Sequence, residues 1–153
     1  MLLHALALAA VFLPTYGPIA QPASTTPPGM RIPVSSTEAL ILNSGSTNTA
    51  GYRLRVSTSG WTTLQQGDVA LRKRVAARFV QQLFADLRAI GPLDELATHP
   101  CMKSASFGTS MVIVYRGKTS PDISCPGTSR ALQQDALALA DAAGVSLMAR
   151  PLP

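Results

Sequence analysis

The sequence predicts a small α+β domain, in which two helices pack on one face of a mainly antiparallel sheet of four or five strands. Short β-forming segments lie before and after one long segment of helical periodicity, which gives the order β-ββ-α-ββ-α. There is no regular alternation of strand and helix that would require a parallel sheet. The chain has 153 residues, 46% apolar and 14% charged, which fits one packed domain and excludes a wholly disordered chain.

The N-terminal residues are predicted to lie outside this domain. Residues 2–13 form an uncharged apolar run, followed by prolines and the small Ala20, which is typical of a secretory signal peptide over residues 1–20. The run is too short to cross a membrane, so we expect no transmembrane anchor after processing. No Lys or Arg precedes it, so a retained amphiphilic N-terminus is the alternative. We expect an exported protein, periplasmic or extracellular, with a disordered Pro/Ser/Thr-rich spacer at 21–37, the domain at 38–147 and a flexible tail at 148–153.

The first three strands follow the spacer. Residues 38–42 form a short apolar run before a cluster of turn formers, which predicts a buried strand. Residues 51–66 predict a hairpin that turns at Gly60. In the first arm of this hairpin, Arg53 and Arg55 alternate with apolar residues, so both arginines lie on the face away from the core. That face is expected to be open to solvent or to a partner.

A long helix is predicted over residues 69–90. Apolar residues recur there at three- and four-residue steps, Asp68 can cap the N-terminus, and a Gly-Pro pair follows the end. Four cations gather within two turns of this expected helix: Arg72, Lys73, Arg74 and Arg78. Together with Arg53 and Arg55 they are the candidate partner-binding residues, and a solvated helix face is the alternative interpretation.

The C-terminal part predicts a second hairpin and a second helix. Residues 110–115 are rich in β-branched aliphatic side chains and predict a central strand. Residues 119–124 predict a weaker edge strand, because a proline within it cannot donate to a ladder. Residues 130–143 predict a helix capped by Thr128 or Ser129.

The two cysteines, Cys101 and Cys125, are predicted to form a disulfide. An even number of cysteines suits an exported chain, and closing this loop stabilises the fold by about 3.5 kcal/mol on the chain-entropy model. The spacing does not match a Cys-x-x-Cys redox motif, and one histidine after the leader, His99, is too few for a zinc site.

The sequence contains no recognisable catalytic pattern. It lacks Gly-x-Ser-x-Gly and Ser-x-x-Lys, and its one adjacent acid pair, Asp94-Glu95, is explained by a solvated turn. We therefore expect no catalytic residue, no cofactor and no metal. The alternative is a small hydrolase whose Ser and Asp residues meet only in the fold. A pocket with converging Ser and Asp groups and a shifted pKa would favour that alternative.

Net charge narrows the kinds of partner. At +5 the chain is basic, which suits an acidic protein or an anionic envelope component. Nucleic acid is not expected, since an exported protein rarely meets it and few aromatic residues are available to stack on bases. The sequence does not predict the oligomeric state.

Three segments carry a resemblance to known proteins. They are GSTNTAGY at 45–52, CMKSASFGT at 101–109 and SPDISCP at 120–126. Over residues 38–143 the chain resembles a group of small exported bacterial proteins of uncharacterised function, which implies no activity. Its order of elements is distantly similar to that of emfourin-type proteinase inhibitors, to which this chain adds the cysteine pair. We therefore expect a non-catalytic binding or inhibitor-like domain.

Overall fold

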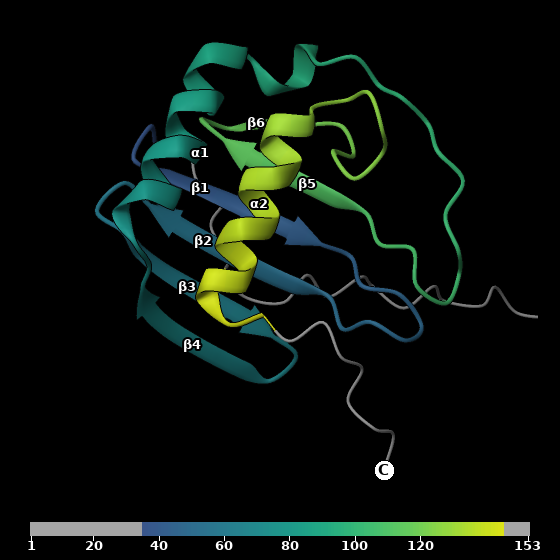
Figure 1. The fold of residues 1–153 in the computed structure, drawn as a ribbon, viewed down its shortest axis with the longest axis horizontal. Helices are drawn as coiled ribbons and strands as arrows, with labels where there is room; N and C mark the ends of the chain where they lie inside the picture. The colour runs from purple at the N-terminus through teal and green to yellow at the C-terminus, as the bar shows by residue number, and fades with distance from the viewer. Residues whose placement is uncertain (1–34, 146–153) are drawn as a thin grey trace, which may run out of the picture. The chain divides into compact units, whose positions relative to one another are not determined.

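A computed structural model describes residues 35–145, and Figure 1 shows one twisted sheet with both helices on the same face. The elements are β1 (Glu38–Asn43), β2 (Tyr52–Ser57), β3 (Trp61–Gln66), β4 (Val69–Arg74), α1 (Ala77–Ile90), the short 3-10 helix η1 (Leu93–Glu95), β5 (Met111–Tyr115), β6 (Lys118–Thr119) and α2 (Arg130–Ala143). All strand pairs are antiparallel, in the order β4-β3-β2-β1-β5-β6. The predicted fold class is confirmed, with six strands where four or five were expected.

The core lies between the sheet and the two helices. Alternate residues of the strands point to the helix side, where Leu54 and Ile113 are fully buried. Leu83 of α1 and Leu132 of α2 meet them, also fully buried. Each such side chain contributes about 1.5–3 kcal/mol through removal of its surface from water. The helices therefore fix one face of the sheet as the inner face.

The prediction of a helix over residues 69–90 is wrong in its first part. Residues 69–74 form β4, which pairs with β3, and α1 begins only at Ala77. Gly67, at φ +57°, and Asp68 make a two-residue turn, so Asp68 is not a helix cap. The helical periodicity in fact starts close to α1, whereas residues 69–74 are exposed on both faces of the sheet. Residues 69–74 therefore form a strand because they pair with β3, although their own sequence weakly favours a helix.

The prediction of a strand over residues 119–124 is also only partly right. Only Lys118–Thr119 pair with β5, and the chain then leaves the ladder at the proline. Ser120 and Ile123 nevertheless remain bonded to β5. The backbone N–H of Ser120 donates to Ile113 O at 2.9 Å, and that of Ile123 donates to Met111 O at 2.8 Å. The segment therefore covers the edge of β5 without being a strand.

The two helices meet at a pair of carboxyl groups. Burial, together with the facing Asp86 on α1, raises the pKa of Asp135 on α2 to about 7. The folded protein thus holds a proton here that the unfolded chain releases above about pH 4. This contact therefore lowers the free energy of unfolding as pH rises from about 4 to 7. The prediction for the C-terminal helix is confirmed, and Ser129 is its cap, since its hydroxyl accepts from Leu132 N at 3.4 Å.

Within residues 35–145, no helix is long and apolar enough to cross a membrane. The predicted signal peptide over residues 1–20 lies outside the described residues. The same holds for residues 21–34 of the predicted spacer and for the predicted tail at 148–153.

Candidate functional site

Four of the six predicted cations share the face of the sheet that points away from the helices. They are Arg53 and Arg55 on β2 and Arg72 and Arg74 on β4. The register places Arg55 and Arg72 on either side of Thr63, and paired residues point to the same face. Lys73 lies on the helix side of β4, and Arg78 lies on α1. The predicted stripe of four cations on one helix is therefore wrong, because three of them belong to β4.

We call Arg53, Arg55, Arg72, Arg74 and Trp61 the arginine face. The guanidinium carbon of Arg72 lies 4.7 Å from the centroid of the Trp61 ring, and 42% of Trp61 is exposed. Arg55 pairs with Glu38 at 3.3 Å. A shallow groove of about 280 Å³ runs along this surface, lined by both of these arginines, Glu38 and Trp61. It is an exposed cationic surface with an aromatic side chain at one end, where Trp61 pairs with Arg74.

The arginine face is confined to one half of the sheet. On the neighbouring strands β1 and β5, the same side carries the apolar Leu40 and Val114, which pair with each other and are both buried. The expectation that this side is open therefore holds for β2, β3 and β4, where Arg53 is exposed.

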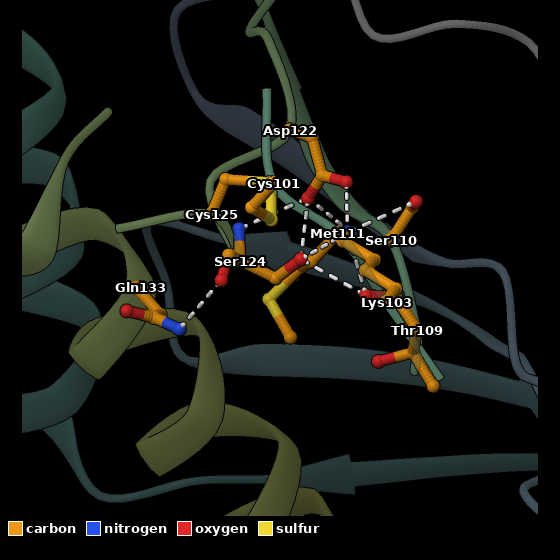
Figure 2. Close-up of a disulfide and its surroundings, with 9 residues drawn as sticks. All are labelled: Cys101, Lys103, Thr109, Ser110, Met111, Asp122, Ser124, Cys125 and Gln133. Carbon is orange, nitrogen blue, oxygen red and sulfur yellow. Dashed lines mark hydrogen bonds and ion pairs between the residues drawn. A yellow bond between two sulfur atoms is a disulfide. The ribbon is translucent and has the colours of Figure 1, made fainter. Parts of the chain in front are cut away.

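The predicted disulfide is confirmed, and Figure 2 shows it with the side chains around it. Cys101 and Cys125 are joined at an S–S distance of 2.04 Å, with their Cα atoms 5.5 Å apart. The bond links the irregular segment after α1 to the segment after β6.

An ion pair that sequence reasoning missed lies beside the disulfide. The Lys103 ammonium contacts the carboxylate of Asp122, and it donates to Ser124 Oγ at 2.7 Å and to Thr109 O at 2.8 Å. It also donates to Ser110 Oγ at 3.1 Å. Figure 2 shows these groups converging on the lysine from two loops. The disulfide is the signal that could have found this pair, because bridging the cysteines brings the residues two and three positions away close together.

The electrostatics of this network favour an ionised Asp122. Burial alone would raise the pKa of Asp122, but hydrogen bonds from Lys103, from Ser124 and from the backbone N–H of Met111 outweigh burial and hold this pKa well below its usual range. The Met111 N–H donates to Oδ1 at 3.0 Å, and the Ser124 hydroxyl donates to it at 2.5 Å. The carboxylate is thus a structural acceptor that ties β5 to the loop that follows β6.

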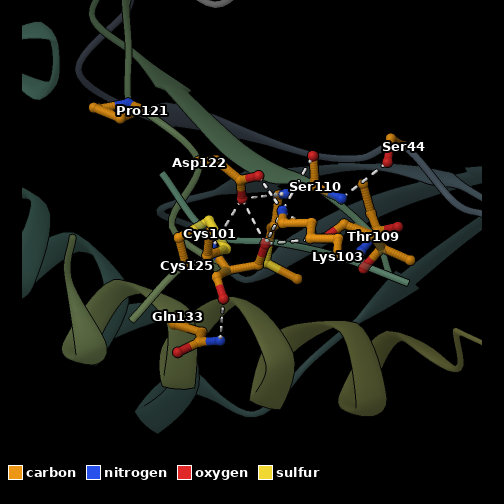
Figure 3. A network of polar contacts seen from close by, with 12 residues as sticks. Ser44, Cys101, Lys103, Thr109, Ser110, Pro121, Asp122, Cys125 and Gln133 are labelled. Carbon is orange, nitrogen blue, oxygen red and sulfur yellow. Dashed lines mark hydrogen bonds and ion pairs between the residues drawn. A yellow bond between two sulfur atoms is a disulfide. The ribbon is translucent and has the colours of Figure 1, made fainter. Parts of the chain in front are cut away.

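The turn between β1 and β2 packs against the irregular segment that carries Lys103. In the turn between β1 and β2, Asn48 N donates to Ser106 O at 3.1 Å, and the Ser46 hydroxyl donates to the same oxygen at 2.8 Å. Ser110 N donates to Ser44 Oγ at 2.9 Å, as Figure 3 shows. Of the three segments on which the resemblance rests, residues 101–109 therefore contact both of the others, and the three form one loop cluster held by the disulfide and the ion pair.

The loop cluster has a feature that would favour a hydrolase, because a serine and an aspartate with a shifted pKa converge beside a hollow. Ser124 lines a hollow of about 380 Å³ together with Tyr52, Phe107 and Gln133. The Ser124 hydroxyl is hydrogen bonded to Asp122. Catalysis needs a base that accepts the proton of the serine. Lys103 donates in every contact described above, and the lowered pKa of Asp122 makes it a weak base. Burial also raises the pKa of Tyr52 to about 12. The arrangement suits a structural network better than an acyl-transfer site.

Among residues 35–145, no group of three or more His, Cys, Asp or Glu side chains could hold a metal ion. Comparisons of the chain with protein-family models, with curated proteins and with solved structures returned no match.

Proposed function

We propose that the protein is an exported, non-catalytic binding domain that holds an anionic partner, a protein or an envelope component, on the arginine face. The observation that carries this proposal is the gathering of four arginines and a half-exposed Trp61 on one side of the sheet. Guanidinium groups form paired hydrogen bonds with carboxylates and phosphates. The Trp61 ring supplies rigid apolar contact area next to them.

Two features support export. The disulfide is of the kind that persists in oxidising compartments. The apolar run at residues 2–13 has the length and composition of a signal peptide. Intact-mass measurement of the protein recovered from the periplasm or the medium tests export, and we expect a chain that begins near Gln21. A mass that matches residues 1–153 would contradict it.

Binding is tested with poly-L-glutamate as the anionic probe at low ionic strength. The variant Arg53→Glu with Arg72→Glu removes two attractive contacts and adds two repulsive ones, so we expect binding about tenfold weaker or worse. The matched control is Arg88→Glu with Arg130→Glu, two exposed helix positions that change the net charge equally. Equal losses in both variants would mean that net charge, and not the arginine face, attracts the probe.

The second candidate is a small hydrolase with Ser124 as the nucleophile, which is favoured by the position of this hydroxyl in the hollow described above. The wild type and Ser124→Ala are compared on a panel of activated esters. On the binding proposal, the two proteins give the same background rate. Turnover by the wild type that Ser124→Ala abolishes would establish the hydrolase instead.

A further inference from the structure

The outer edge of β4 is bare within the described residues. Val75 N donates to Gly60 O at 3.0 Å, in the same register that pairs Trp61 with Arg74. Along an antiparallel ladder, hydrogen-bonded residue pairs alternate with pairs that are not hydrogen bonded. Counting back from Val75, every second residue of β4 therefore directs its backbone N–H and C=O groups toward β3. The other three residues direct their backbone N–H and C=O groups away from β3: Ala70, Arg72 and Arg74.

The side chains of this edge strand divide into two kinds. On one side stand Arg72 and Arg74, as part of the arginine face. On the other side Val69 and Leu71 are unusually accessible for large apolar residues, with 50% and 44% of their surface exposed. A strand that added to this edge would meet Arg72 and Arg74 on one face, and on the other face Val69 and Leu71, followed by Lys73.

We propose that β4 accepts an extended segment of a partner protein as a seventh strand, and that this segment alternates acidic and apolar residues. The proposal rests on the proposed function, since it names the class of partner that the arginine face takes. Backbone hydrogen bonds to the free edge supply affinity that does not depend on sequence. Opposite charges on directly facing residues of neighbouring strands attract, so acids opposite Arg72 and Arg74 select the partner.

Charge argues against a second copy of this chain as the occupant. Pairing β4 with itself would bring the three consecutive cations at 72–74 of both copies into one short ladder. Like charges on neighbouring strands repel. An acidic strand has the complementary charge, whereas a flexible polyanion without regular strand geometry cannot use the free backbone groups.

The test uses a seven-residue peptide, Thr-Val-Glu-Val-Glu-Val-Thr, and a version of it that is N-methylated at alternate residues and so cannot form a ladder. Binding to the full-length protein is measured by calorimetry. The key variant is Ala70→Pro, which removes an outward N–H but no bond to β3 and retains every arginine. Its matched control is Ala70→Val, which keeps the N–H. We expect the plain peptide to bind at least tenfold more tightly than the methylated one, and Ala70→Pro, but not Ala70→Val, to lose most of this difference.

The outcomes separate this inference from the proposed function. If both peptides bind equally to the wild type and to Ala70→Pro, the strand proposal is overturned while the anionic preference of the arginine face stands. If neither the peptides nor poly-L-glutamate bind, the proposed function fails as well. Formation of a dimer through β4 in the absence of peptide, seen by sedimentation and abolished in Ala70→Pro, would assign this edge to a second copy and would also overturn the strand proposal.

Discussion

At the β5 end of the sheet, the segment after β6 takes up the free backbone groups of the strand, whereas β4 at the other end has no such cover within residues 35–145. Met111 N donates to Asp122 Oδ1 at 3.0 Å, and Ile113 N donates to Ser120 Oγ at 2.9 Å. The carbonyl groups of both β5 residues accept from backbone N–H groups of the same segment. The disulfide and the Lys103 ion pair hold this segment in place.

The difference shows two ways in which a sheet can avoid uncontrolled pairing at its edges. An edge can be covered, as β5 is, or it can carry charged side chains, as β4 does. Cover closes the edge to every partner, whereas positive charge closes it only to neutral or basic strands. The β4 edge therefore remains available to an acidic strand.

The largest expected effect comes from removing the cover of the β5 edge. Replacement of both Cys101 and Cys125 by Ser should lower the free energy of unfolding by about 2–4 kcal/mol, because the loop regains its freedom in the unfolded chain. Hydrogen exchange should rise first at residues 101–109 and 119–127 and leave α1 protected. Chemical denaturation and exchange measure the two effects. A double variant that unfolds at the wild-type midpoint would show that the bond does not stabilise this edge.

The next effect concerns the ion pair that supports the same cover. Lys103→Met leaves the half-buried Asp122 carboxylate without its cation, so the free energy of unfolding should fall by about 1 kcal/mol after allowance for screening by water. The control is Lys118→Met, which breaks the exposed pair with Asp94 and should leave the unfolding midpoint unchanged. Equal effects of the two substitutions would contradict a special role for Lys103.

Acidic pH should loosen the cover of the β5 edge and leave the β4 edge unchanged. The pKa of Asp122 is lower in the folded protein than in the unfolded chain, so its contribution to stability is present above about pH 4 and is lost as pH falls below that value. Hydrogen exchange at residues 119–127, corrected for its intrinsic dependence on pH, should therefore increase near pH 3, while β4 changes little. In Asp122→Asn this selective increase should disappear. An increase of the same size in the variant would assign the acid sensitivity to another group.

The smallest effect on stability is expected at the β4 edge. Replacement of Arg72, Lys73 and Arg74 by Thr keeps the strand propensity, so the free energy of unfolding should change by less than about 0.5 kcal/mol. Self-association should rise instead, because the charges that guard the bare edge are gone. Sedimentation over a range of concentrations measures it. If the variant associates no more than the wild type, these cations do not guard the edge.

The sequence predicted those elements whose patterns are local. The alternation around Arg53 and the β-branched run at 110–115 indicated strands because each pattern sets its own inner face. The helix at 130–143 was predicted with its bounds unchanged. The segment 69–74 was missed because it is exposed on both faces, and its strand state depends on pairing with β3.

The candidate site was predictable to a smaller extent. Alternation placed Arg53 and Arg55 on the outer face, but Arg72 and Arg74 join them only through the register of β4 with β3. The contact between Lys103 and Asp122 spans 19 positions of the chain and matches no motif. Such long-range contacts are properties of the folded topology, and no periodicity in a single sequence encodes them.

On the proposal above, the β4 edge binds an acidic strand while the β5 edge is closed. The most direct measurement is residue-resolved amide hydrogen exchange with and without the alternating valine-glutamate peptide. We expect fast exchange at the amides of Ala70, Arg72 and Arg74 in the free protein and marked slowing at saturation with peptide, whereas the amides of Met111 and Ile113 exchange slowly in both states. Outward β4 amides that are already slow without peptide, or that stay fast when the peptide is bound, would contradict the proposal.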